Sequence, residues 1–198
     1  MAIGNSITQH NETEFWWSTC GMAASTTDND YYHIVLRGLS NIKGIINSTI
    51  VPYSAWELMS DDRSETYYLI DDYLVSEVDL ITIQLGENAK YVNTFEMDLE
   101  ALIHHIQEKC PNAQIMIIGD FWSFVDRDEM KNRVSIKMEV DYIDLSEIKE
   151  NPEFMAGLGY TVCGADGSSH SVEHEGVAKH PNDKGMNYIA TKILGNVK

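Results

Sequence analysis

Asp79-Leu80-Ile81-Thr82-Ile83-Gln84-Leu85 is a nearly continuous apolar run, and a glycine, Gly86, ends it. Residues 114–118, Gln-Ile-Met-Ile-Ile, repeat the pattern and also end at a glycine, Gly119. Apolar runs of this length are typical of strands that are buried on both faces of a parallel sheet. The two runs therefore predict two central strands of such a sheet.

Helical patterns alternate with these runs. Between Thr94 and Lys109, apolar residues recur at positions 95, 99, 102, 103 and 106, which lie on one face of a helix that Thr94 is suited to cap. Further helices are expected over residues 30–39 and 127–139, and a further strand over residues 45–51.

A closing helix is expected over residues 183–194, with Asn182 or Asp183 as its cap and Gly195 after its end. Alternation of strands and helices predicts an α/β protein, a three-layer α/β/α sandwich with a central parallel sheet and right-handed crossovers.

Length and composition indicate one globular unit. The 198 residues contain no repeat or proline-rich linker, so we expect a single domain over residues 1–198. The net charge is −17, with no cluster of Lys and Arg, which argues against nucleic acid or an acidic membrane surface as a partner and favours a neutral substrate. Homo-oligomerisation stays open.

The sequence shows no recognisable targeting segment and no cysteine motif. No apolar run approaches the roughly 20 residues of a membrane span, and no signal-peptide pattern is present, so a cytoplasmic location is expected unless a leader has been removed. The three cysteines, at positions 20, 110 and 163, have no CxxC spacing and suggest neither a disulfide framework nor a zinc ribbon.

Candidate chemical groups follow the predicted strands, where active sites of parallel sheets lie. Gly4-Asn5-Ser6 places a serine hydroxyl just past a short first strand, and Asn88 follows the strand that ends at Leu85. His180, stiffened by Pro181 at the entrance of the last helix, is suited to act as a general base. Each signal alone has a plain alternative: a turn, a loop cap or a surface histidine.

Together these motifs occur in an informative order. Gly4-Asn5-Ser6-Ile7-Thr8, then Gly21-Met22-Ala23-Ala24-Ser25, Gly86-Glu87-Asn88 and His180-Pro181-Asn182-Asp183-Lys184-Gly185-Met186 resemble the SGNH hydrolase family, the GDSL-type esterases and lipases, and especially a bacterial branch of it. The resemblance covers nearly the whole chain. It implies the flavodoxin-like fold of that family.

The resemblance also implies a mechanism. Ser6 would attack an ester carbonyl and His180 would act as its base. The Ser6 N–H, the Gly21 N–H and the Asn88 side chain would form the oxyanion hole. No metal and no other cofactor would be needed. The expected enzyme is a carboxylic ester hydrolase for short acyl groups such as acetyl, carried by a small-molecule ester or an acylated sugar.

Two positions differ from the usual family motif. Asn5 stands where the family has Asp, and Val177 stands where the family has the acid partner, three residues before the histidine. Glu175 is the proposed replacement acid, because it is close in sequence. A histidine without an acid can still work as a dyad when its second nitrogen binds a backbone carbonyl.

Other readings stay open. Asn5, Trp16, Trp17 and Glu87 are expected to contact the substrate, since loops past strand ends line such pockets. A thioesterase or lipase, or a binding domain with an incomplete triad, would fit the same motifs. His170 and His174 raise a metal-dependent alternative, although no third ligand has a recognisable spacing.

Overall fold

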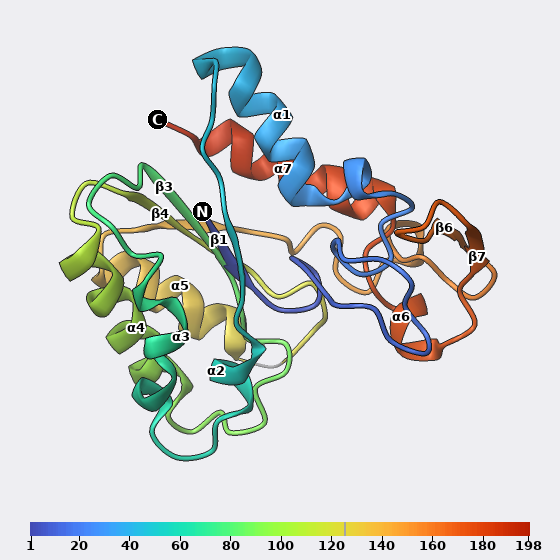
Figure 1. Ribbon diagram of the computed structural model, residues 1–198. Coiled ribbons are helices and arrows are strands. Elements are labelled where there is room, and N and C mark those ends of the chain that lie inside the picture. The colour runs from blue at the N-terminus through green and yellow to red at the C-terminus, as the bar shows by residue number, and fades with distance from the viewer. Residues whose placement is uncertain (125) are drawn as a thin grey trace.

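A five-stranded parallel sheet lies at the centre of the computed structural model, which describes residues 1–124 and 126–198 (Figure 1). The spatial order of its strands is β2-β1-β3-β4-β5, which reverses between β1 and β3 as in flavodoxin-like folds. The strands are β1 (Ala2–Gly4), β2 (Ile50–Pro52), β3 (Leu80–Gln84), β4 (Gln114–Ile118) and β5 (Asp141–Ile143). A separate antiparallel pair consists of β6 (Thr161–Cys163) and β7 (Ser169–Ser171).

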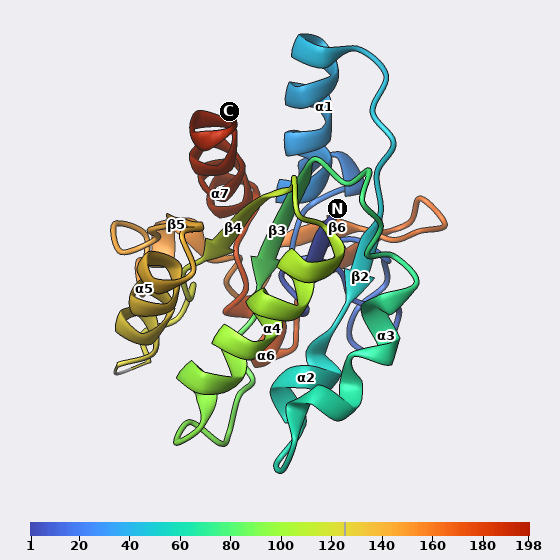
Figure 2. The same ribbon diagram turned by 90° about the vertical axis from the view of Figure 1, so that its left-hand side faces the viewer.

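Helices cover both faces of the sheet and make the expected three layers (Figures 1 and 2). One face carries α1 (Tyr31–Lys43) and α7 (Asp183–Asn196), and the other carries α3 (Tyr68–Asp71), α4 (Phe95–Lys109) and α5 (Arg127–Lys137). Two short helices, α2 (Ser54–Leu58) and α6 (Glu175–Ala178), lie near the carboxyl ends of the strands. The described residues also form the 3-10 turns η1 (Thr27–Asn29), η2 (Arg63–Thr66) and η3 (Pro152–Phe154).

The alternating side chains of the central strands build two cores. Ile81, Ile83, Ile115 and Ile117 pack towards α4, while Met116 and Ile118 lie in the core that includes α1 and α7. The predicted apolar face of α4, at positions 95, 99, 102, 103 and 106, is completely buried. Each such side chain contributes about 1.5–3 kcal/mol through burial, so this face anchors the helix.

Four predicted boundaries are wrong. The helix expected over residues 127–139 ends at Lys137, and Glu139 beyond it has a positive φ of 55°. The strand expected over residues 45–51 is confined to β2, because the run before it leaves the sheet and Ile45 is 99% exposed. Helix α1 continues past residue 39 to Gly44, whose positive φ of 86° ends it. Helix α7 runs through Gly195 to Asn196, since Ile193 and Leu194 continue its contacts with the core.

Candidate active site

Ser6 and His180 lie together although 174 residues separate them in the chain. Ser6 follows β1, and His180 lies between α6 and α7, so the carboxyl end of the sheet brings them within reach. The Ser6 Oγ is 2.8 Å from the His180 Nε2. A hydroxyl at hydrogen-bond distance from an imidazole is the arrangement of an activated nucleophile and its base.

The second nitrogen of His180 defines the tautomer of the ring. The Nδ1 is 2.8 Å from the carbonyl oxygen of Gly176, and a carbonyl only accepts hydrogen bonds. The Nδ1 therefore carries the proton, which leaves the Nε2 free to accept a proton from Ser6. Burial lowers the pKa of His180 to about 4, so the ring is neutral at pH 7.

Glu175 is not the acid partner of His180, contrary to the prediction. Its side chain is exposed, and the carbonyl of Gly176 occupies the position beside the His180 Nδ1. This carbonyl is available because α6 is short: the His180 N–H donates to Val177 instead of continuing the helix. The side chain of Val177 is 1% exposed and packs into the core. The contact of the His180 Nδ1 with a backbone carbonyl is the geometry of the alternative that the sequence left open, a histidine without an acid partner.

Asn88 and Gly21, the two expected oxyanion donors outside Ser6, both have internal partners. The Asn88 Nδ2 donates to the Glu57 Oε2 over 2.8 Å, which leaves the second N–H of this amide for another acceptor. The Gly21 N–H donates to the Asp30 Oδ2 over 3.2 Å. A Cβ at position 21 would lie 2.4 Å from the carbonyl of Ile7, so close backbone approach explains this glycine. Its oxyanion role stays a prediction, and the bond to Asp30 argues against it.

Asn5 and Glu87 are buried structural residues, so the prediction that they contact substrate is wrong. The Asn5 Nδ2 donates to the Glu57 Oε1 over 3.0 Å and to the Glu87 Oε2 over 2.8 Å, and the Asn5 Oδ1 accepts from the Ile7 N–H. All hydrogen-bonding atoms of the Asn5 side chain are thereby engaged. An aspartate at position 5 would place a third carboxylate between two others, which gives a physical reason for an amide at this position.

The two tryptophans of the loop after Ser6 differ. Trp16 is completely buried, which contradicts its expected contact with substrate. Trp17 is half-buried and stacks on His170, with ring centroids 4.3 Å apart. A cavity beside it is lined by both tryptophans and by Glu12, Thr13, Asp166 and His170. Only Trp17 of this pair keeps a surface for a ligand.

A further aromatic ring, that of Trp122, lies beside His180. Trp122 meets His180 edge to face, with ring centroids 4.9 Å apart, and its Nε1 donates to the carbonyl of Lys179. It follows a strand end, which was the available signal. Its indole limits the space on one side of the imidazole.

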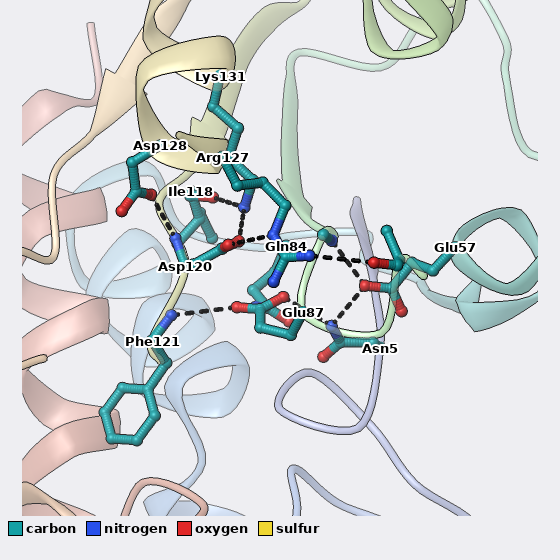
Figure 3. Close-up of polar contacts among 12 residues, drawn as sticks. Asn5, Glu57, Gln84, Glu87, Ile118, Asp120, Phe121, Arg127, Asp128 and Lys131 are labelled. Carbon is teal, nitrogen blue, oxygen red and sulfur yellow. Dashed lines mark hydrogen bonds and ion pairs between the residues drawn. The ribbon is translucent and has the colours of Figure 1, made fainter. Parts of the chain in front are cut away.

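A buried polar network lies beneath the strand-end loops (Figure 3). Its members are Asn5, Glu57, Gln84, Glu87, Asn88, Asp120, Arg127 and Lys131. Asp120 binds Arg127 and Lys131 over 2.5 and 2.6 Å, and these two cations hold its pKa below the usual range although burial alone would raise it. Burial, and the nearby Asp120, raise the pKa of Glu87 to about 7.

Of the charged members of this network, the sequence had pointed only to Glu87, and Glu57, Asp120, Arg127 and Lys131 were not predicted. Asp120 follows the glycine that ends β4, so its place at a strand end could have identified it. Glu57, Arg127 and Lys131 carry no such signal, because isolated charged residues in helices are mostly exposed.

The two histidines of the metal hypothesis have other contacts. The His170 Nε2 is 2.6 Å from the Ser168 Oγ, while His174 accepts from the Gly176 N–H and stacks on Phe15. Within residues 1–124 and 126–198, no three His, Cys, Asp or Glu side chains are grouped as a metal site would require. In the same described part of the chain, none of the helices has the length and apolar character needed to cross a membrane.

Solved structures share this fold across the whole chain. A phospholipase A1 from Streptomyces albidoflavus aligns with a TM-score of 0.63 at 10% identity, covering 100% of this chain and 98% of its own. A two-domain esterase active on acetylated mannans aligns with a TM-score of 0.62 at 16% identity. That alignment covers 100% of this chain, which spans only 48% of the esterase. A protein described as a GDSL-like lipase, from Parabacteroides merdae, gives 0.59 at 16% identity, with 100% and 94% coverage.

The sequence itself matches no protein-family model and no curated protein. The structural likeness nevertheless confirms the expected fold class: the chain has the α/β/α fold of the SGNH hydrolases, the GDSL-type lipases and esterases.

Proposed function

We propose that this chain is a serine esterase that removes short acyl groups, acetyl first, from a neutral substrate such as an acylated carbohydrate. The observation that carries the proposal is the 2.8 Å contact of the Ser6 Oγ with the His180 Nε2, in the tautomer that the Gly176 carbonyl selects. The fold supports ester hydrolysis, because its structural neighbours include esterases and lipases.

In the proposed reaction, the Ser6 Oγ attacks the ester carbonyl while its proton passes to the His180 Nε2. The free N–H of Asn88 and the Ser6 N–H stabilise the tetrahedral oxyanion. The protonated His180 then gives its proton to the leaving alkoxide. Water, deprotonated by the same nitrogen, releases the acyl group from Ser6. The Gly176 carbonyl stays bound to the Nδ1 throughout and keeps the ring in place.

Several features support a small, uncharged substrate. Trp122 limits the space on one side of His180, which favours a short acyl group, and the half-buried Trp17 is an aromatic ring that a sugar could contact. The net charge of −17 repels polyanions, including nucleic acid and acidic membrane surfaces. One structural neighbour acts on acetylated mannans, which is consistent with an acetylated sugar.

The direct test is hydrolysis of p-nitrophenyl esters from acetate to long chains by the wild type and by Ser6→Ala. We expect the acetate to react fastest, and the variant to lose at least about 10³-fold in kcat/KM, since the nucleophile is removed. Ser40→Ala, an exposed serine on α1, is the matched control and should keep wild-type activity. Equal activity of the wild type and Ser6→Ala would disprove the mechanism.

A binding domain that has lost catalysis is the second candidate, because the His180 Nδ1 contacts the Gly176 carbonyl and no carboxylate among the described residues. A fluorophosphonate probe separates the two. Covalent labelling of Ser6 in the wild type supports the esterase, whereas no labelling of well-folded protein supports the binding domain.

A further inference from the structure

Glu57 is a completely buried carboxylate that the mechanism above does not use. It lies on α2, and Figure 3 shows it facing Asn5 beneath the strand ends. Four N–H groups donate to it: the Asn5 Nδ2, the Gly86 N and the Asn88 N to its Oε1, over 3.0, 2.6 and 3.2 Å, and the Asn88 Nδ2 to its Oε2, over 2.8 Å. Three of these donors belong to the loop that carries Asn88.

This carboxylate determines which end of the Asn88 amide faces it. The two ends of an asparagine amide have nearly the same shape, so the hydrogen-bonding partner selects the orientation. Because both Glu57 oxygens accept from N–H groups, the Nδ2 of Asn88 must face Glu57 and the Oδ1 is excluded there. The amide nitrogen therefore keeps its second N–H pointing away from Glu57, and no described residue accepts from it.

Glu57 also fixes the backbone from which this amide projects. Its Oε1 binds the N–H groups of both Gly86 and Asn88, and the Ala89 N–H donates back to the Gly86 carbonyl. Gly86 has a φ of 136°, a conformation that favours glycine. The loop is thus held in one shape at two backbone positions and one side chain.

We propose that Glu57 is a positioning residue for ester hydrolysis, which holds the Asn88 amide with an N–H donor directed at the oxyanion. The proposal rests on the proposed function, because it needs Asn88 to act as that donor. Glu57 itself touches no reacting atom. Its expected contribution is that of one oriented oxyanion donor, typically 10²–10³ in rate.

Glu57→Gln is the decisive variant, because it keeps size and shape but changes one acceptor into a donor. If the glutamine oxygen stays on the Gly86 and Asn88 N–H groups, its NH₂ faces the Asn88 side chain. The Asn88 amide then turns its Oδ1 towards residue 57 and presents no donor to the oxyanion. We expect kcat for p-nitrophenyl acetate to fall about 100-fold, with KM changed less than about threefold.

Asn88→Ala and the double variant test whether Glu57 acts through Asn88. We expect Asn88→Ala to lose about as much activity as Glu57→Gln, and the double variant to lose no more than Asn88→Ala alone. Glu96→Gln is the matched control: this carboxylate on α4 accepts from Arg133 and contacts neither Asn5 nor Asn88, so the variant should keep kcat within about twofold. Thermal unfolding of each variant checks that the fold persists. If Glu57→Gln fails to fold, Glu57→Asp, which keeps two acceptors on a shorter chain, enters the same cycle.

The outcomes separate the two proposals. An equal loss from the Glu57 change with and without Asn88 would overturn the positioning role while leaving the esterase intact. The same holds if Glu57→Gln keeps wild-type kcat. Activity that survives in Ser6→Ala would overturn the esterase mechanism, and the role of Glu57 would fall with it.

Discussion

The two sides of the candidate site use carboxylates in opposite ways. On the side of the base, where a catalytic triad has its acid, the His180 Nδ1 binds only the backbone carbonyl of Gly176. On the side of the oxyanion, Asn88 binds the buried carboxylate of Glu57, and Glu87 and Asp120 lie in the same network. Buried charge therefore serves to hold the strand-end loops and not to stabilise an imidazolium. A sequence that lacks the triad carboxylate can therefore still place an oriented histidine beside the serine.

Asn5→Asp should give the largest effect, because it brings a third carboxylate between Glu57 and Glu87 and removes both donors that bridge them. We expect a loss of about 3–5 kcal/mol in the free energy of unfolding at pH 8, the cost of an uncompensated buried charge. The new carboxyl has a folded pKa raised above its unfolded value, so the native state binds more protons. The loss should therefore grow as pH rises from 4 to 8.

Urea unfolding at several pH values measures this loss. Asn11→Asp, at an exposed loop position, is the matched control and should change stability by less than about 0.5 kcal/mol. Equal stability of the two variants at pH 8 would contradict the bridging role of Asn5.

The pH profile of kcat/KM should give the next largest effect. In the proposed mechanism the neutral imidazole is the base, and the pKa of His180 is lowered to about 4, chiefly by burial. At pH 5 the wild type should keep about nine tenths of its activity, whereas a histidine with the ordinary pKa of about 6.5 would keep about 3%. Activity should be lost only as pH falls through about 4. A fall centred near pH 6.5, measured with a pH-stable ester, would show that His180 titrates normally in the free enzyme.

Glu175→Gln should give the smallest effect. The Glu175 side chain is exposed and the Gly176 carbonyl already occupies the His180 Nδ1, so kcat/KM should change less than about twofold. Loss of a true triad acid costs about 10⁴-fold in kcat, which makes the outcomes easy to separate. A loss above about 100-fold would restore Glu175 as the acid partner and remove the contrast between the two sides.

Local sequence patterns were sufficient for most of the fold. The apolar runs at β3 and β4 and the five-residue face of α4 are buried as predicted, because both periodicities follow from backbone geometry alone. The strand predicted over residues 45–51 was too long. Its first residues are apolar as in a strand, but in the described sheet the pairing begins only at Ile50. Pairing is a tertiary property, which short sequence windows do not contain.

The site was predicted less completely. Ser6 and His180 were found through ordered motifs, and the structure brings them together. Glu57 lies in the short apolar-rich helix Ser54–Leu58 and looks like an ordinary surface glutamate, because its four donors come from other segments of the chain. The buried state of a charge depends on such distant partners, and so it could not be predicted from the neighbouring residues.

The acceptor that orients His180 is a peptide carbonyl, and every amino acid supplies one. No single substitution at position 176 can delete it, so a mutational scan of the proposed nucleophile, its base and the base's partner would register two sensitive side chains where a triad enzyme shows three. Substitutions of the side chains in α6 leave this hydrogen bond intact, whereas a change in the number of residues between Gly176 and His180 breaks it. We expect an insertion or deletion of one residue between Gly176 and His180 to move the carbonyl away from the ring, so that His180 is no longer oriented to accept the Ser6 proton.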